Sequence, residues 1–267
     1  MNSPSRPTVF LTQSRFIEFL FAAGLPLIGY CLAITSHNAL PQIWLMLIAT
    51  GLAGAHILTF NDACFPERRG TLRLAGVHAC ILAPLFIFVW SRGHHGAVLA
   101  LLAMIVNWDL YAWIGKRNWL LSLLHHFIGG ALHVSVGFLF AGGDWRQAAF
   151  VGVYFGLCMT GGAMHHEAID VDEDHAAGFV SGAVRFGFQR WFVLGAAPMT
   201  LAHLWLLQQL NCFSAVMLTA FAVYIVLLLV DAARRLDHCR AMAFRMNCRI
   251  LYGLAGAGYL VWRFVTL

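Results

Sequence analysis

Long apolar stretches separated by short polar segments dominate this sequence and limit the fold to a bundle of membrane helices. Of its 267 residues, 60% are hydrophobic and 11% are charged. Soluble domains carry about 25% charged residues, so this composition indicates a polytopic membrane protein. No polar segment is long enough to form a soluble domain, and we expect one all-α transmembrane domain over residues 1–267. A spanning helix needs roughly 20 mainly apolar residues. Nine segments qualify: 16–35, 42–60, 73–91, 96–114, 119–141, 147–165, 191–209, 213–231 and 248–266.

Basic residues are concentrated on one side of the expected membrane. Fourteen of the 17 lie in the N-terminus or in the segments after the second, fourth, sixth and eighth apolar stretches. Cytoplasmic loops carry an excess of Lys and Arg, so we expect an integral, multi-pass protein whose N-terminus and long loops are cytoplasmic. The excess of basic residues mainly sets the membrane topology. Contact with anionic membrane lipid is its second role. Nucleic-acid binding is not indicated, because the charge is divided among loops.

Cysteine and histidine patterns argue against several metal and disulfide classes. The seven cysteines are scattered without a CxxC pair, which disfavours a disulfide framework or a structural zinc site. Thirteen histidines would suit haem or copper. However, no pair has a metal-specific spacing, and buried histidines with hydrogen-bond partners are the commoner case.

Five acidic residues lie within eight positions at the end of the sixth apolar stretch, although the chain has only 12 acids: Glu167, Asp170, Asp172, Glu173 and Asp174. With helical steps of about 100° per residue, Glu167, Asp170 and Asp174 share a narrow face if the helix continues. Carboxylate oxygens suit Mg2+, which proteins usually share with substrate phosphates. The pattern therefore predicts a membrane enzyme that handles a diphosphate, with a solvated acidic helix end as the alternative.

Three segments together resemble the UbiA superfamily of intramembrane prenyltransferases. Residues 170–187 fit the second aspartate-rich motif of that family, D-x3-D-x3-G-x2-T-x5-G, with Ser181 in the Thr position. Asn61-Asp62 resembles the start of the first motif, N-D-x2-D-x3-D. The segment from Tyr111 to Lys116-Arg117 resembles Y-S-P-P-L-K-R in spacing. The nine expected helices also match the number of helices in that family.

The resemblance implies a UbiA-like bundle of nine transmembrane helices with a central cavity open to the cytoplasmic side and to lipid. It further implies a Mg2+-dependent transferase that ionises an allylic prenyl diphosphate and passes the isoprenyl group to a small, commonly aromatic acceptor. The implied catalytic residues are Asp62, Asp170, Asp174 and Lys116. The implied Mg2+ ligands are Asn61, Asp62, Glu67, Glu167, Asp170 and Asp174. The implied substrate contacts are Asn61, Arg68, Arg69, Asp109, Tyr111, Lys116 and Arg117.

The first motif departs from the family pattern. Phe65 and Arg69 stand where the family has its second and third aspartates. Pro66 should break the helix, which could turn Glu67 back toward Asp62. Arg69 could meet the diphosphate directly, because Arg pairs well with phosphate oxygens. Arg68 and Arg69 could equally serve topology alone.

An acid inside an apolar span is a functional candidate by default, and Asp109 is such an acid. It could orient an acceptor or steady a cationic intermediate. It could equally pair with Lys116 or Arg117 as a structural bridge.

Other functions stay open at this point. A UbiA-type terpene cyclase would use the same ionisation and quench the cation internally. A non-catalytic isoprenoid carrier is consistent with Phe65 and Arg69. A transporter is disfavoured, because no apolar stretch carries paired charges near its middle.

Overall fold

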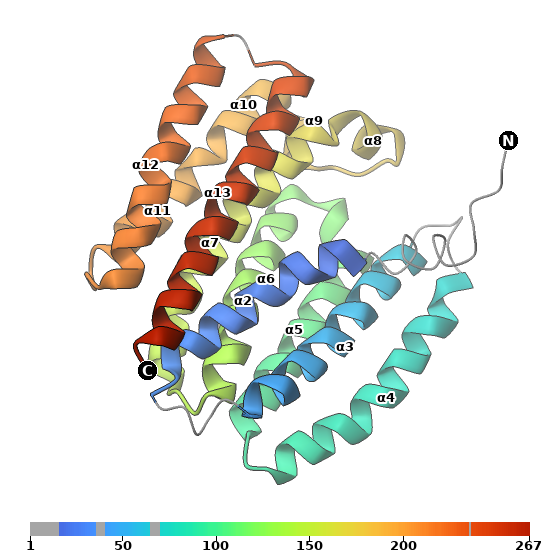
Figure 1. Cartoon of the computed structure of the whole chain (residues 1–267). Coiled ribbons are helices and arrows are strands. Elements are labelled where there is room, and N and C mark those ends of the chain that lie inside the picture. Colours follow the sequence, from blue (N-terminus) through green and yellow to red (C-terminus); the bar gives the residue numbers. More distant parts are fainter. Residues whose placement is uncertain (1–15, 36–40, 65–69, 235) are drawn as a thin grey trace, which may run out of the picture. The chain divides into compact units, whose positions relative to one another are not determined.

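Helices make up the fold, as the apolar stretches predict. The computed structural model describes residues 16–35, 41–64, 70–234 and 236–267, and these contain no β-strand (Figure 1). The elements are α2 (Phe16–Ala33), α3 (Pro41–Ala63), α4 (Leu72–Ser91), α5 (His95–Trp113), the 3-10 turn η3 (Gly115–Arg117), α6 (Trp119–Phe140), α7 (Trp145–Ile169), α8 (Val171–Ala176), α9 (Gly182–Phe186), α10 (Phe188–Leu194), α11 (Ala196–Leu206), α12 (Cys212–Ala233) and α13 (His238–Val265).

Six helices in the described part of the chain are long and apolar enough to cross a membrane: α3, α4, α5, α6, α7 and α12. The chain is therefore an all-helical integral membrane protein, as its composition predicts. Nine spanning helices and a cavity open to the cytoplasmic side stay predictions.

Two expected spans differ from the helices observed. Residues 191–209 were expected to form one helix, but α10 ends at Leu194 and α11 begins at Ala196. A continuous helix would need an N–H at Pro198 to bond the carbonyl of Leu194, and proline has none. The last span was expected from residue 248, but α13 already begins at His238. Its N-cap is Asp237, whose Oδ1 accepts a hydrogen bond from the N–H of Arg240 at 2.8 Å.

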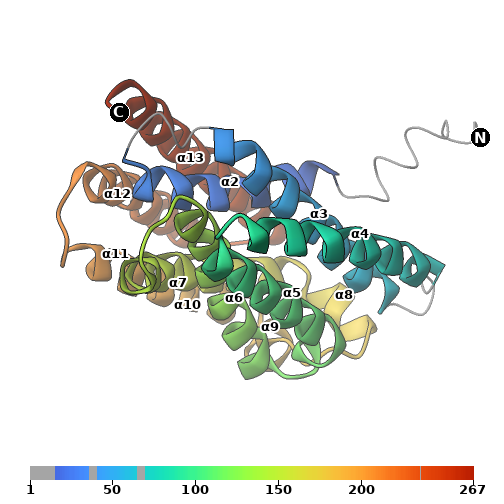
Figure 2. The same cartoon turned by 90° about the horizontal axis from the view of Figure 1, so that it is seen from below.

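The helices cluster into two compact units. Unit 1 contains residues 1–113 and 132–149, and unit 2 contains residues 114–131 and 150–267. In unit 1, α3 packs against α2, α4 and α5 (Figure 1). In unit 2, α12 packs against α11 and α13, and Figure 2 shows α11 and α12 side by side. The expectation of a single domain over residues 1–267 stays a prediction.

Two glycines allow backbones to touch within unit 1. A Cβ at Gly137 of α6 would overlap the carbonyl oxygen of Pro26 in α2. A Cβ at Gly29 of α2 would likewise overlap the carbonyl oxygen of Val134 in α6. Small residues at such crossings are how membrane helices pack closely. The contact between α2 and this part of α6 therefore depends on glycine from both helices.

Gly137→Ala should destabilise the protein by about 1–3 kcal/mol, the usual cost of overpacking a filled interface. The obstacle is backbone, so no side chain can rotate away. The measurement is the thermal unfolding midpoint in detergent. Gly76→Ala in α4 is the matched control, because nothing lies within 4 Å of a Cβ added at Gly76. Equal midpoints for the two variants would contradict the close contact.

Candidate active site

The α-helix is interrupted at Asp170, within the acidic cluster: α7 ends at Ile169 and α8 begins at Val171. Backbone hydrogen bonds run through the junction, since the N–H of Asp174 donates to the carbonyl of Asp170 at 2.8 Å. However, Asp170 has φ −92° and ψ 12°, away from α-helical values near −63° and −42°. The straight helix that would place Glu167, Asp170 and Asp174 on one face therefore ends with α7, at Ile169. Within the described residues, no three His, Cys, Asp or Glu side chains are grouped to hold one ion.

Glu167 connects four elements of unit 2. Its Oε1 accepts a hydrogen bond from Ser122 Oγ of α6 at 2.5 Å. Its Oε2 accepts one from Trp191 Nε1 of α10 at 2.9 Å and one from the N–H of Gly182 in α9 at 3.2 Å. The side chain is buried, and residue Glu167 is only 9% exposed. Both carboxylate oxygens are thus engaged by protein donors, which the sequence pattern did not reveal.

The chain after the acidic cluster is held by close packing and a helix cap. A Cβ at Gly182 would overlap the ring of Trp191. Trp191 in turn stacks on Phe186 at 5.5 Å and meets the edge of Trp119 at 5.8 Å between ring centroids. Ser181 caps α9, because its Oγ accepts from the N–H of Val184. The hydroxyl residue at the Thr position of the motif therefore serves locally as the N-cap of α9.

The surroundings shift the pKa values of Asp170 and Asp174 in opposite directions. Burial raises the pKa of Asp170, but the hydrogen bond and charge of His166, whose Nδ1 lies 2.9 Å from Asp170 Oδ2, outweigh it together with the charges of Arg245 and His238 and lower that pKa. Burial and the neighbouring charge of Asp170 raise the pKa of Asp174, against the effect of a hydrogen bond from Ser181. Two adjacent carboxyls of this kind favour a bound cation, because it would relieve the repulsion between them.

A basic residue from another element lies beside the segment 177–181, which joins α8 to α9. Lys116, in η3, has its Nζ 5.6 Å from the ring centroid of Phe179. Phe179 stands between Asp174 and Ser181, so unit 2 brings Lys116 to the acidic segment, while Arg117 is exposed. Arg185, which sequence reasoning did not single out, has its Cζ 5.8 Å from the ring centroid of Trp119.

The first-motif residues lie at the end of α3 in unit 1. Asp62 is buried and 4% exposed. Asn61 Oδ1 is buried and has no hydrogen-bond partner among the described residues. An amide oxygen without a donor is a candidate ligand for a hard cation. Tyr111 packs edge-on against Trp108 at 5.5 Å between ring centroids. Glu67, Arg68 and Arg69, together with Phe65 and Pro66, lie outside the described residues.

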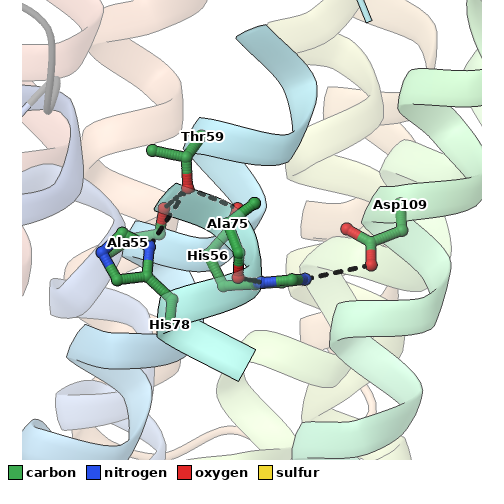
Figure 3. A network of polar contacts seen from close by, with 6 residues as sticks. All are labelled: Ala55, His56, Thr59, Ala75, His78 and Asp109. Carbon is green, nitrogen blue, oxygen red and sulfur yellow. Dashed lines mark hydrogen bonds and ion pairs between the residues drawn. The ribbon is translucent and has the colours of Figure 1, made fainter. Parts of the chain in front are cut away.

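Asp109 pairs with a histidine of α3. Its Oδ2 lies 3.2 Å from Nε2 of His56 on α3 (Figure 3). The other ring nitrogen of His56, Nδ1, lies 3.0 Å from the carbonyl oxygen of Ala75 on α4. Next to it, Thr59 Oγ1 lies 3.2 Å from Nδ1 of His78. The sequence placed each of these groups inside an apolar span but gave no sign of the pairing.

Comparisons with known proteins identify the fold. Neither a protein-family model nor a curated protein matches the chain. Among solved structures, a UbiA homolog from Archaeoglobus fulgidus bound to GPP and Mg2+ has 14% identity and a TM-score of 0.73, covering 96% of this chain and 98% of that one. The structure of digeranylgeranylglyceryl phosphate synthase has 15% identity and a TM-score of 0.69, over 96% and 98% of the two chains. A UbiA homolog from Aeropyrum pernix K1 has 14% identity and a TM-score of 0.68, over 91% and 97%. The chain therefore has the fold of these UbiA homologues.

Proposed function

We propose that this chain is a UbiA-type membrane prenyltransferase, with a prenyl diphosphate as donor and Mg2+ as cofactor. The observation that carries the proposal is the second motif, in which Asp170 caps α8 and Asp174 lies one turn later, while Lys116 lies over the ring of Phe179 in the segment that follows α8. The fold supports it, since a structure of the same fold was solved with GPP and Mg2+. We further propose that the N-terminus and both acidic motifs face the cytoplasm.

The oxygen donors suit magnesium. Asn61, Asp62, Asp170 and Asp174 would hold Mg2+, and Glu67 is a further candidate. We assign Glu167 to positioning instead, because both of its oxygens already accept hydrogen bonds from Ser122, Trp191 and Gly182. When bound, Mg2+ supplies positive charge that stabilises the departing diphosphate.

The residues of the chain itself would bind and orient the donor. Lys116 and Arg117, with Arg68 or Arg69, would meet the diphosphate oxygens as charge-assisted donors. The bond between C1 of the prenyl group and the diphosphate oxygen then breaks, and its electron pair leaves with the diphosphate. The allylic cation forms a new bond to an electron-rich, aromatic acceptor, which loses a proton. Membrane lipid would surround the prenyl tail.

Lys116→Gln should raise KM for a prenyl diphosphate by about 10- to 100-fold. A hydrogen bond to a charged group contributes about 1.5–3 kcal/mol, and each 1.36 kcal/mol is a factor of ten. Steady-state kinetics with GPP measure the change. Arg190→Gln is the matched control, because Arg190 is an exposed cation on α10 that the proposal does not use. Equal KM values for both variants would exclude diphosphate binding by Lys116.

Mass spectrometry of products tests the reaction class directly. The purified protein is incubated with Mg2+, prenyl diphosphates of several chain lengths and a panel of phenolic acceptors. We expect diphosphate release together with a prenylated acceptor. A cyclic hydrocarbon formed without acceptor would instead identify a terpene cyclase. Tight binding of the diphosphate with no release would identify an isoprenoid carrier.

A further inference from the structure

Three helices of unit 1 meet at a polar pair that the proposed metal and diphosphate contacts do not use. His56 of α3 lies between Ala75 of α4 and Asp109 of α5 (Figure 3). His56 precedes Asn61 by five residues on the same helix, which is about 7.5 Å along its axis. His56 thus lies more than one turn farther from the end of α3 than Asn61 and Asp62 do. At that position a reacting carbon and its acceptor fit better than a phosphate.

The geometry fixes where the protons of this pair lie. The carbonyl of Ala75 can only accept, so Nδ1 of His56 must carry a hydrogen and donate it at 3.0 Å. The contact of Nε2 with Asp109 Oδ2 at 3.2 Å then needs one further proton between the two atoms. Either the ring is an imidazolium and Asp109 a carboxylate, or the ring is neutral and Asp109 is a carboxylic acid. In both cases the pair holds one shared proton.

The second oxygen of Asp109 lacks a hydrogen-bond donor. Asp109 Oδ1 is buried and has no hydrogen-bond partner among the described residues. Figure 3 shows only one of the two Asp109 oxygens directed at His56. A buried acceptor left without a donor costs about 1–3 kcal/mol. A ligand with a hydroxyl group would supply the missing donor, whereas an anionic group would be repelled by the carboxylate.

We propose that Asp109, supported by His56, is the base that takes the proton from a hydroxyl-bearing acceptor, an assignment that rests on the proposed prenyl transfer. The acceptor O–H bond breaks, and its electron pair stays on the acceptor. The proton goes to Asp109 Oδ1, while the shared proton resides on the imidazole. The activated acceptor then forms its bond to C1 of the allylic cation. His56 acts as a positioning residue, because it touches Asp109 and not the acceptor.

The test separates ionisation of the donor from transfer to the acceptor. Asp109→Asn should lower formation of prenylated product from GPP and a phenolic acceptor by about 100-fold, the lower range for a general base. Release of diphosphate from GPP without acceptor should stay within a factor of about three. His78→Gln is the control, since His78 bonds Thr59 and lies outside the pair. Equal losses of release and transfer, or no loss of transfer, would overturn the role of Asp109.

A spectrum of the unmodified protein tests the pair without relying on activity. Nitrogen-15 NMR of labelled histidine, with His56→Gln to assign the signal, should show hydrogen on Nδ1 of His56. A ring protonated only on Nε2 would overturn the shared proton. If the wild-type protein releases no diphosphate from any prenyl diphosphate, the proposed function fails and the base assignment fails with it. If the wild-type protein releases diphosphate and only the results for Asp109→Asn differ from expectation, the proposed function holds and the base assignment fails.

Discussion

Asp170→Asn and Asp174→Asn should each lower Mg2+-dependent prenyl transfer by about a thousandfold. Each substitution removes a negative charge and one oxygen ligand from the N-terminal part of α8, where the second motif begins. Charge stabilisation by a catalytic metal is worth several kcal/mol, and about 4 kcal/mol corresponds to a factor of a thousand. The measurement is diphosphate release from GPP at saturating acceptor, over a range of Mg2+ concentrations.

Asp172→Asn provides the control for this pair of variants. Asp172 belongs to the same acidic segment and is exposed, so its loss changes net charge without removing a proposed ligand. We expect wild-type turnover for that variant, and equal expression and melting behaviour for all three. Turnover retained by both Asp170→Asn and Asp174→Asn would refute the metal role of the motif.

Glu167→Ala should cost about 4 kcal/mol of folding stability. The substitution leaves three donors, Ser122 Oγ, Trp191 Nε1 and the N–H of Gly182, without their shared acceptor in a buried site. Each unsatisfied buried group costs about 1–3 kcal/mol, and the Ser122 hydroxyl can rotate to another partner. The measurement is unfolding in detergent, followed by tryptophan fluorescence because Trp191 lies in the affected cluster.

Two milder variants separate hydrogen bonding from metal binding at Glu167. Glu167→Gln keeps one carbonyl oxygen as acceptor and should cost less than half as much, with Mg2+ dependence unchanged. Ser122→Ala removes a single donor and should cost about 1 kcal/mol. A Glu167→Gln protein that is stable but needs far more Mg2+ would show that Glu167 is a metal ligand after all.

Much of the helical layout could be predicted from sequence because membrane helices are specified locally. An apolar stretch of sufficient length is enough, and α3 to α7 and α12 follow the expected segments closely. Residues 238–247 of α13 were missed because Arg240 and Arg245, with other polar residues, make this part too polar for that criterion. The sequence signal for the break between α10 and α11 is Pro198, and a count of hydrophobic residues does not register it.

The site was only partly predictable, for a different physical reason. Motif spacing locates Asp170, Asp174 and Ser181 in the chain, because those residues share one local segment. The partners of Glu167 come from α6, α9 and α10, and those of Asp109 come from α3. Such contacts depend on which helices pack together, and spacing within one helix carries no information about that. Helical geometry alone therefore grouped Glu167 with Asp170 and Asp174, whereas tertiary contacts give it other partners.

The central proposal is that Asp62 and Asp170 each take part in binding Mg2+ together with a prenyl diphosphate. Mn2+ can replace Mg2+ as a paramagnetic probe, and pulsed electron paramagnetic resonance detects phosphorus next to it. With GPP, the wild-type protein should show Mn2+ coupled to phosphorus, and both Asp62→Asn and Asp170→Asn should weaken that signal strongly. An unchanged signal in both variants, or no protein-bound Mn2+ in the presence of GPP, would contradict the account.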